Sequence, residues 1–122
     1  MIFDFQYSFR PLLCVQILDL SYNKICNIEC LEGLLIIELN LEGNEITSLQ
    51  GLDQNPRLSV LNVAKNRISS LAPLSSCTQL HNLKVGDNLI SKIRQVEFLE
   101  GLRWLRHLNL SGNPCCSKQY YR

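Results

Sequence analysis

The stretch LSVLNVAKNRISSL, residues 58–71, contains an apolar pattern that recurs along the whole chain. The alternation of Leu61 and Val63 has the period of a short strand, with these side chains facing inward and their neighbours facing outward. After Asn66, the three-residue spacing of Ile68 and Leu71 suits a 3₁₀ turn or a short helix. The pattern therefore predicts a strand, a turn and a helical segment in a single unit.

The same unit occurs five times in register. Successive copies of its asparagine are 21, 22, 22 and 25 residues apart, and these copies are Asn23, Asn44, Asn66, Asn88 and Asn113. A unit this short cannot bury its own leucines, so its stability must come from stacking on its neighbours. We expect the asparagine amides to bond to backbone groups of the turn and of the next coil, and so to form a structural ladder.

Composition excludes several classes of protein. The chain has 122 residues, of which 46% are apolar and 23 are leucine, so it is long enough for one ordered domain and too apolar for a disordered one. No apolar run approaches the roughly 18 residues that a membrane span requires. A net charge of +1 gives no electrostatic reason to expect nucleic acid or an anionic membrane as a partner.

The five units resemble leucine-rich repeats. Their length near 22, with isoleucine two places after the asparagine, resembles the short-repeat intracellular subclass typified by a regulatory subunit of protein phosphatase 1. The resemblance covers residues 15–122 and implies an α/β solenoid. In that fold a curved parallel sheet forms the concave wall, and 3₁₀ or short helices and loops form the convex wall. The family's roles are scaffolding and regulation, including phosphatase targeting and spliceosomal, tubulin-related and axonemal assemblies.

Three segments are expected. Residues 1–14 form an amino-terminal leader or capping strand, because aromatic residues alternate with polar ones from Phe3 to Phe9. Residues 15–113 form the five repeats, and residues 114–122 resemble the start of a carboxy-terminal cap that is incomplete. We expect a fragment or short isoform whose last coil leaves Leu108 and its apolar neighbours uncovered on one side, an edge that favours self-association.

The outward positions of the strands define a candidate binding surface for a protein partner. Acidic residues gather in the first two repeats and basic residues in the later ones, which either orients a partner of opposite polarity or is an ordinary solvated face. The predicted concave-face residues are Asp19, Tyr22, Glu38, Asn40, Glu42, Asn62, Lys65, Asn82, Lys84, Asp87, Arg106 and His107.

The fourth repeat is three residues longer than the others and predicts a fuller helix on the convex wall. Ile93, Val96, Leu99 and Leu102 have helical spacing there, so packing is the first explanation for them. Trp104, which lies just before the last strand, has two interpretations. It is a buried core residue, which we favour, or a hot spot for a partner.

Cysteine and histidine positions give no evidence of catalysis or metal binding. The chain has six cysteines but no export signal, so we expect reduced thiols and a cytoplasmic protein, with nucleus, cilium or cytoskeleton as alternatives. Cys26 with Cys30, and Cys77 with His81, are spaced as zinc ligands are, but no second pair lies at a usual distance. Cys77 is instead expected to pack beneath the loop before a strand. No catalytic residue and no cofactor are predicted.

The leading functional hypothesis is a noncatalytic scaffold or adaptor that binds a protein on its concave face. The alternative is the targeting arm of a larger multidomain enzyme or of a cytoskeletal or axonemal protein. A secreted recognition module would require paired cysteines. RNA binding ranks last, because the chain is nearly neutral and its aromatic residues are concentrated in the leader.

Overall fold

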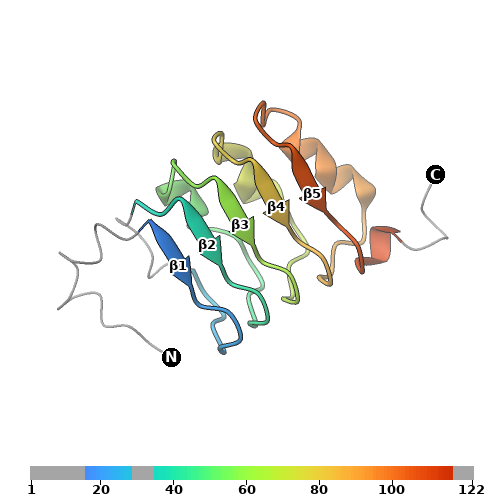
Figure 1. Cartoon of the computed structure of the whole chain (residues 1–122). Helices are drawn as coiled ribbons and strands as arrows, with labels where there is room; N and C mark the ends of the chain where they lie inside the picture. The colour runs from blue at the N-terminus through green and yellow to red at the C-terminus, as the bar shows by residue number, and fades with distance from the viewer. Residues whose placement is uncertain (1–15, 29–34, 117–122) are drawn as a thin grey trace.

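Five parallel strands form one sheet in the order in which they occur along the chain (Figure 1). The computed structural model describes residues 16–28 and 35–116; the predicted leader and the end of the predicted cap lie outside them. The strands are β1 (Ile17–Asp19), β2 (Glu38–Asn40), β3 (Val60–Asn62), β4 (Asn82–Lys84) and β5 (His107–Asn109). The 3₁₀ helices are η2 (Leu52–Gln54), η3 (Ala72–Ser76), η4 (Ile93–Leu99) and η5 (Pro114–Cys116).

The strands pair without any shift in register. The central leucine of each strand lies beside that of the next, and these leucines are Leu18, Leu39, Leu61, Leu83 and Leu108. Each repeat therefore advances the chain by one strand. This parallel arrangement confirms the predicted solenoid fold class.

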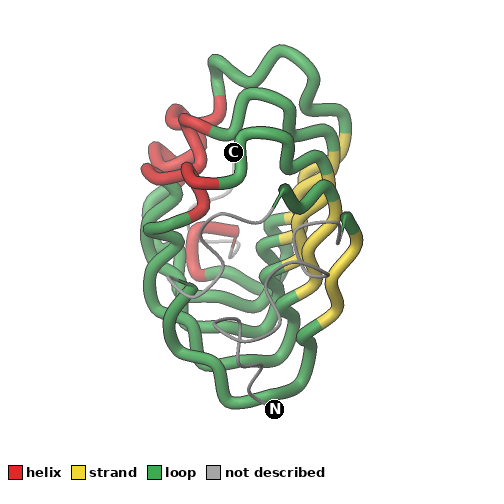
Figure 2. The backbone as a smooth tube through the Cα atoms, turned by 90° about the vertical axis from the view of Figure 1, so that its left-hand side faces the viewer, coloured by secondary structure: helices red, strands yellow, loops and turns green. Residues whose placement is uncertain are grey.

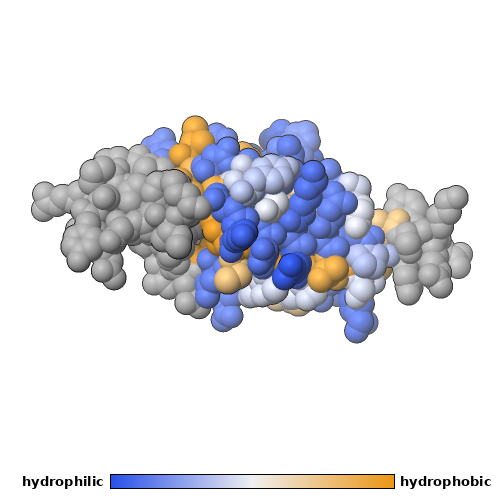
Figure 3. Space-filling view, turned by 90° about the horizontal axis from the view of Figure 1, so that it is seen from below, coloured by the Kyte–Doolittle hydropathy of each residue, from blue (hydrophilic) through white to orange (hydrophobic). Residues whose placement is uncertain are grey.

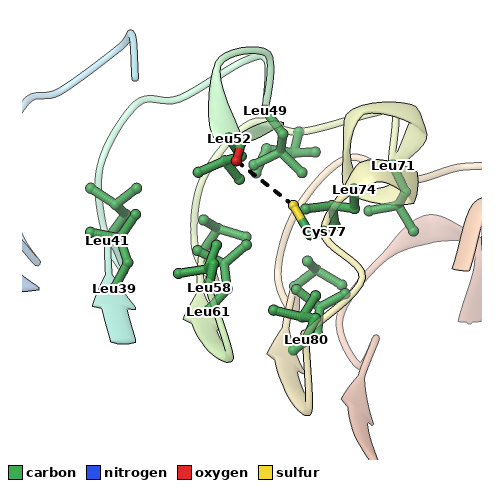
Figure 4. Packing of buried hydrophobic residues seen from close by; sticks show 14 of the residues in the cluster. Leu39, Leu41, Leu49, Leu52, Leu58, Leu61, Leu71, Leu74, Cys77 and Leu80 are labelled. Carbon is green, nitrogen blue, oxygen red and sulfur yellow. Dashed lines mark hydrogen bonds between the residues drawn. The ribbon is translucent and has the colours of Figure 1, made fainter. Parts of the chain in front are cut away.

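The strands lie on one wall of the coil, and η2, η3 and η4 lie on the opposite wall (Figure 2). The space between the walls is filled with aliphatic side chains, and the leucines of the strands meet those of η2 and η3 there (Figure 4). Leu49, Leu61 and Leu74 are among the fully buried residues. The predicted longer helix of the fourth repeat is η4, the longest of the described helices at seven residues.

The buried asparagine amides join each coil to the one before it. Asn66 Nδ2 donates to the carbonyl oxygens of Leu41, at 2.9 Å, and Val63, at 3.0 Å, while its Oδ1 accepts the amide of Ile46 at 3.0 Å. The equivalent bonds are made by Asn44, Asn88 and Asn113. Backbone groups that the short strands leave unpaired are thereby satisfied inside the core.

Two expectations about the fourth repeat are wrong. Trp104 is 49% exposed rather than part of the core, and Ile93, at the start of η4, is also exposed. Leu99 and Leu102 are buried, as the helical spacing predicts. Ile93 is exposed because η4 packs on η3 and leaves the apolar residues of its other side in contact with solvent, whereas Trp104 follows η4 and stacks on the His81 ring.

The last coil is the most exposed part of the core. Leu108 is 39% exposed, whereas Leu61 and Leu83 at the same register position are fully buried. Leu105 and Leu110 are half-buried against the same cluster. Within the described residues, no strand pairs with the outer side of β5. These leucines are thus less covered than their counterparts in the earlier coils, while the incomplete cap stays a prediction.

We expect Asn66→Ala to lower the free energy of unfolding by about 3 kcal/mol, because it removes the bonds to two carbonyls and leaves the Ile46 amide buried without an acceptor. Urea denaturation followed by circular dichroism measures this change. Asn82→Ala, at an outward strand position, is the matched control and is expected to change stability by less than about 0.5 kcal/mol. Equal losses in both variants would contradict the structural role of the Asn66 amide.

Candidate binding surface

Two rows of outward side chains cross the open face of the sheet, which we call the concave face. Because the register is unshifted, equivalent residues of neighbouring strands stand side by side, about 4.8 Å apart. The first row consists of Ile17, Glu38, Val60, Asn82 and His107. The second row consists of Asp19, Asn40, Asn62, Lys84 and Asn109.

The β1–β2 end of this face combines acidic and apolar groups. Asp19 and Glu38 line a hollow of about 280 Å³ that extends across the sheet to β4. Ile17, which is 67% exposed, and Val60 supply apolar surface in the same hollow. Carboxylates beside exposed aliphatic side chains suit a partner segment that carries both a cation and an apolar residue.

The β4–β5 end carries basic groups. Lys84, Arg106 and His107 line a second hollow, and Asn82 and Lys84 border both hollows. In the part of the chain that the structure describes, the one salt bridge joins Lys65 and Glu42, so these three bases have no acidic partner there. The predicted separation of acids from bases is therefore present in three dimensions, while its use in binding stays a prediction.

Most residues of the second row are engaged in turns. Asp19 Oδ1 accepts the Ser21 amide at 2.9 Å and the Ser21 hydroxyl at 2.7 Å. These two bonds, the hydroxyl first, lower the pKa of Asp19. The same bond to the backbone amide two residues later is made by Asn40, Asn62 and Asn109. Asp19, Asn40 and Asn62 were predicted as partner-binding residues, and their capping role was not predicted, although an Asp or Asn recurs at this position in four of the five repeats.

A second set of predicted site residues forms a network at the turns that follow β1, β2 and β3. The Tyr22 hydroxyl donates to Glu42 Oε2 at 2.9 Å, and Asn62 Nδ2 donates to Glu42 Oε1 at 3.1 Å. Lys65 Nζ lies 3.8 Å from Glu42 Oε2 and 6.0 Å from the centre of the Tyr22 ring. Interaction with Tyr22, chiefly electrostatic, raises the pKa of Lys65, and Glu42 adds to the shift. Glu42 is thus engaged by three neighbours of its own chain.

The residue before each asparagine of the ladder is left-handed in all five repeats. The five positions are Tyr22, Gly43, Lys65, Asp87 and Gly112, with φ between 53° and 79°. The predicted site residues among them, Tyr22, Lys65 and Asp87, therefore belong to the turn edge of the molecule rather than to the two rows on the sheet. Figure 3 views this edge and shows a mostly hydrophilic surface.

An aromatic pair that was not predicted lies before the N-terminal ends of β4 and β5. His81 stacks on Trp104 with ring centroids 6.4 Å apart and an interplanar angle of 17°. His81 Nδ1 is fixed by Ser59 Oγ at 3.0 Å and by the Gln79 carbonyl at 2.6 Å. The spacing of 23 residues between the two rings, about one repeat, is the signal that would have placed them side by side.

Cys77 is enclosed by the core. Its Sγ points to the Leu52 carbonyl at 3.9 Å (Figure 4), and burial raises its pKa to about 11. The prediction that this residue packs beneath the loop before β4 is confirmed. Residues 16–28 and 35–116 contain no group of three or more metal-ligating side chains. No helix in the same ranges is both long and apolar enough to cross a bilayer.

Comparison with known proteins decides the family. A family model described as two copies of leucine-rich repeats matches residues 36–76 and again residues 56–97, which together make up just over half of the chain. The chain belongs to the leucine-rich repeat family. Folds of this family typically serve as noncatalytic scaffolds for protein interaction. A search of curated proteins found no match.

Solved structures include similar leucine-rich repeat proteins. Internalin C2 from Listeria monocytogenes is 28% identical with a TM-score of 0.76, over 89% of this chain and 50% of that one. The internalin inlF from the same species is 33% identical with a TM-score of 0.72, over 80% of this chain and 28% of that one. The leucine-rich repeat domain of APL1B, at 20% identity and a TM-score of 0.65, supports the fold alone. The repeat chain thus spans half or less of each of these structures.

The turn before Asn44 leads to a stability prediction. Gly43 has φ of 73°, and a Cβ there would collide with the Tyr22 ring, so Gly43→Ala is expected to lower the free energy of unfolding by about 2 kcal/mol. Chemical denaturation measures the loss. The matched control is Gly101→Ala, because a Cβ at Gly101 would meet no atom within 4 Å. A Gly43 variant as stable as the control would show that the Tyr22 ring moves aside for the added methyl group at no cost.

Proposed function

We propose that this leucine-rich repeat chain is a noncatalytic scaffold or adaptor that binds a protein partner on its concave face. The observation that carries the proposal is the pair of in-register rows crossing all five strands, with Asp19 and Glu38 at one end and Lys84 and His107 at the other. A rigid surface of this width suits a protein better than a small molecule, because its contacts are spread over several repeats.

The partner is expected to have the opposite polarity. Its basic group faces Asp19 and Glu38, and its acidic group faces Lys84 and Arg106. An apolar residue between them packs on Ile17 and Val60, where exposed aliphatic surface lines the hollow. Such charge complementarity speeds association and fixes orientation, while the apolar contact contributes to affinity.

We further propose that the chain belongs to the short-repeat subclass typified by a regulatory subunit of protein phosphatase 1. This assignment rests on the repeat length near 22 and on the isoleucine two places after each of the first four ladder asparagines.

A second candidate function is the targeting arm of a larger multidomain enzyme or of a cytoskeletal protein. The short coverage of the similar structures, 50% and 28% of their lengths, is consistent with it. We also propose that the exposed Leu108 of β5, with the half-buried Leu105 and Leu110 beside it, allows self-association.

We further propose a reducing compartment, cytoplasmic in the simplest case. All four described cysteines are free, including the adjacent pair Cys115 and Cys116, whose sulfur atoms are 3.8 Å apart. The natural protein, denatured without reductant, is expected to show six reactive thiols by mass after alkylation. Fewer than six would indicate disulfides and favour a secreted recognition module.

Charge reversal tests the concave face as the binding surface. The double variant Glu38→Lys and Lys84→Glu keeps the net charge and is expected to lose proteins that the unaltered chain captures from cell extract. The matched control, Glu97→Lys with Lys92→Glu, makes the same exchange at η4 on the opposite wall and should retain them. Quantitative mass spectrometry measures the captured proteins, and circular dichroism checks folding. Equal capture by both variants would place the binding surface elsewhere.

A further inference from the structure

The second row contains one exception to its capping pattern. In four repeats an Asp or Asn of this row accepts the backbone amide two residues later, at 2.9 to 3.0 Å. In the fourth repeat the row position is Lys84, whose ammonium group has no acceptor atom. The amide that corresponds to the capped ones belongs to Gly86. Within the described residues this amide has no hydrogen-bond acceptor.

The Gly86 amide is directed toward the concave face. Its four counterparts all bond to side chains that project from that face, while the Gly86 carbonyl accepts the Lys65 amide at 2.9 Å. Gly86 is a buried residue in the isolated chain. A buried amide without an acceptor is costly, and such groups call for an explanation.

Basic groups lie on the sheet face beside this amide, whereas the acidic Asp87, the next residue, lies at the turn edge. Lys84 is exposed beside the amide, and Lys84, Arg106 and His107 line one hollow at the β4–β5 end of the sheet. No acidic side chain lines that hollow, and none of the described acids forms a salt bridge with Lys84. A backbone donor and a lysine ammonium at one place match an oxygen ligand that carries negative charge.

We propose that Lys84 and the Gly86 amide together bind a carboxylate from an Asp or Glu side chain of the protein partner. This inference rests on the proposed function and specifies the anchor within it. The partner supplies the oxygen that the chain itself supplies in the other four repeats. The first repeat provides the precedent for a carboxylate, because Asp19 holds the Ser21 amide there with an ionised acid group. The ammonium of Lys84 adds a charge-assisted bond to the second carboxylate oxygen.

Nuclear magnetic resonance tests the site with small probes. The peptide acetyl-Gly-Asp-Gly-amide, added to the ¹⁵N-labelled chain, is expected to shift the Gly86 amide proton downfield in a saturable way, because the proton gains a carboxylate acceptor. The same peptide with Asn instead of Asp should not shift the Gly86 amide proton. An unmoved Gly86 signal, or equal shifts with both peptides, would overturn the proposal. A shift with inorganic phosphate but not with the Asp peptide would overturn the choice of carboxylate.

Substitution of Lys84 separates capping from charge. Lys84→Asn restores the side chain found at this row position in three other repeats, so it should raise the midpoint of thermal unfolding by about 4 °C and abolish the peptide-induced shift. Lys84→Gln removes the same charge with a side chain one methylene longer, and should abolish the shift without the gain in stability. Lys92→Asn, the matched charge control near η4, should change neither property. If Lys84→Asn were no more stable than Lys84→Gln, the Gly86 amide would not be missing a hydrogen-bond acceptor, and the proposal would be wrong.

The outcomes distinguish this inference from the function on which it rests. Suppose that the Glu38 and Lys84 double variant loses protein capture but the Gly86 signal does not move with the Asp peptide. The concave face would then remain the binding surface, and the carboxylate site would be overturned. Capture that survives the double variant would overturn the scaffold surface itself. A partner identified by capture should lose about tenfold or more in affinity when its anchoring acid is changed to the amide.

Discussion

The hydrogen bonds of the buried asparagine amides are the constraint on which the rest of this structure depends. Strands of three residues leave many backbone groups unpaired, and the amide of Asn66 closes its own turn while holding the preceding coil. Because every coil is held in the same way, the strands cannot slip relative to one another. Their zero-shift register aligns the outward side chains into rows, and those rows bring charged side chains of the first two and the last two repeats onto one face.

The repeat made the fold predictable, because apolar spacing that recurs in register has one physical solution, a stack. It also placed residues such as Glu38 and Lys84 on the outer face, since alternation alone separates the two faces of a strand. Spacing could not give the environment of Trp104 and Ile93, because helical periodicity does not tell how far a neighbouring coil extends over them. Nor could it show that Asn40 and Asn62 are occupied by their own turns, which depends on local backbone geometry.

The polar residues of the concave side therefore have different roles. Glu42 is held by Tyr22, Asn62 and Lys65, and it stiffens the turn edge. Asp19 both caps a turn and presents a charge. Lys84 cannot accept the backbone amide two residues later, as its counterparts in the other four repeats do. In a repeat protein such departures are informative, because the other repeats show which residue serves folding at the position. A different residue in one repeat therefore points to a role other than folding.

The unshifted register also fixes the spacing of side chains along the concave face in steps of one strand. Neighbouring strands stand about 4.8 Å apart, so the distance between the acidic and basic ends changes only in whole steps of that size. A relative that gained or lost one complete coil would keep every turn intact but would measure a different partner length. Length discrimination would then evolve by duplication or deletion of one coil, without any new contact having to be designed.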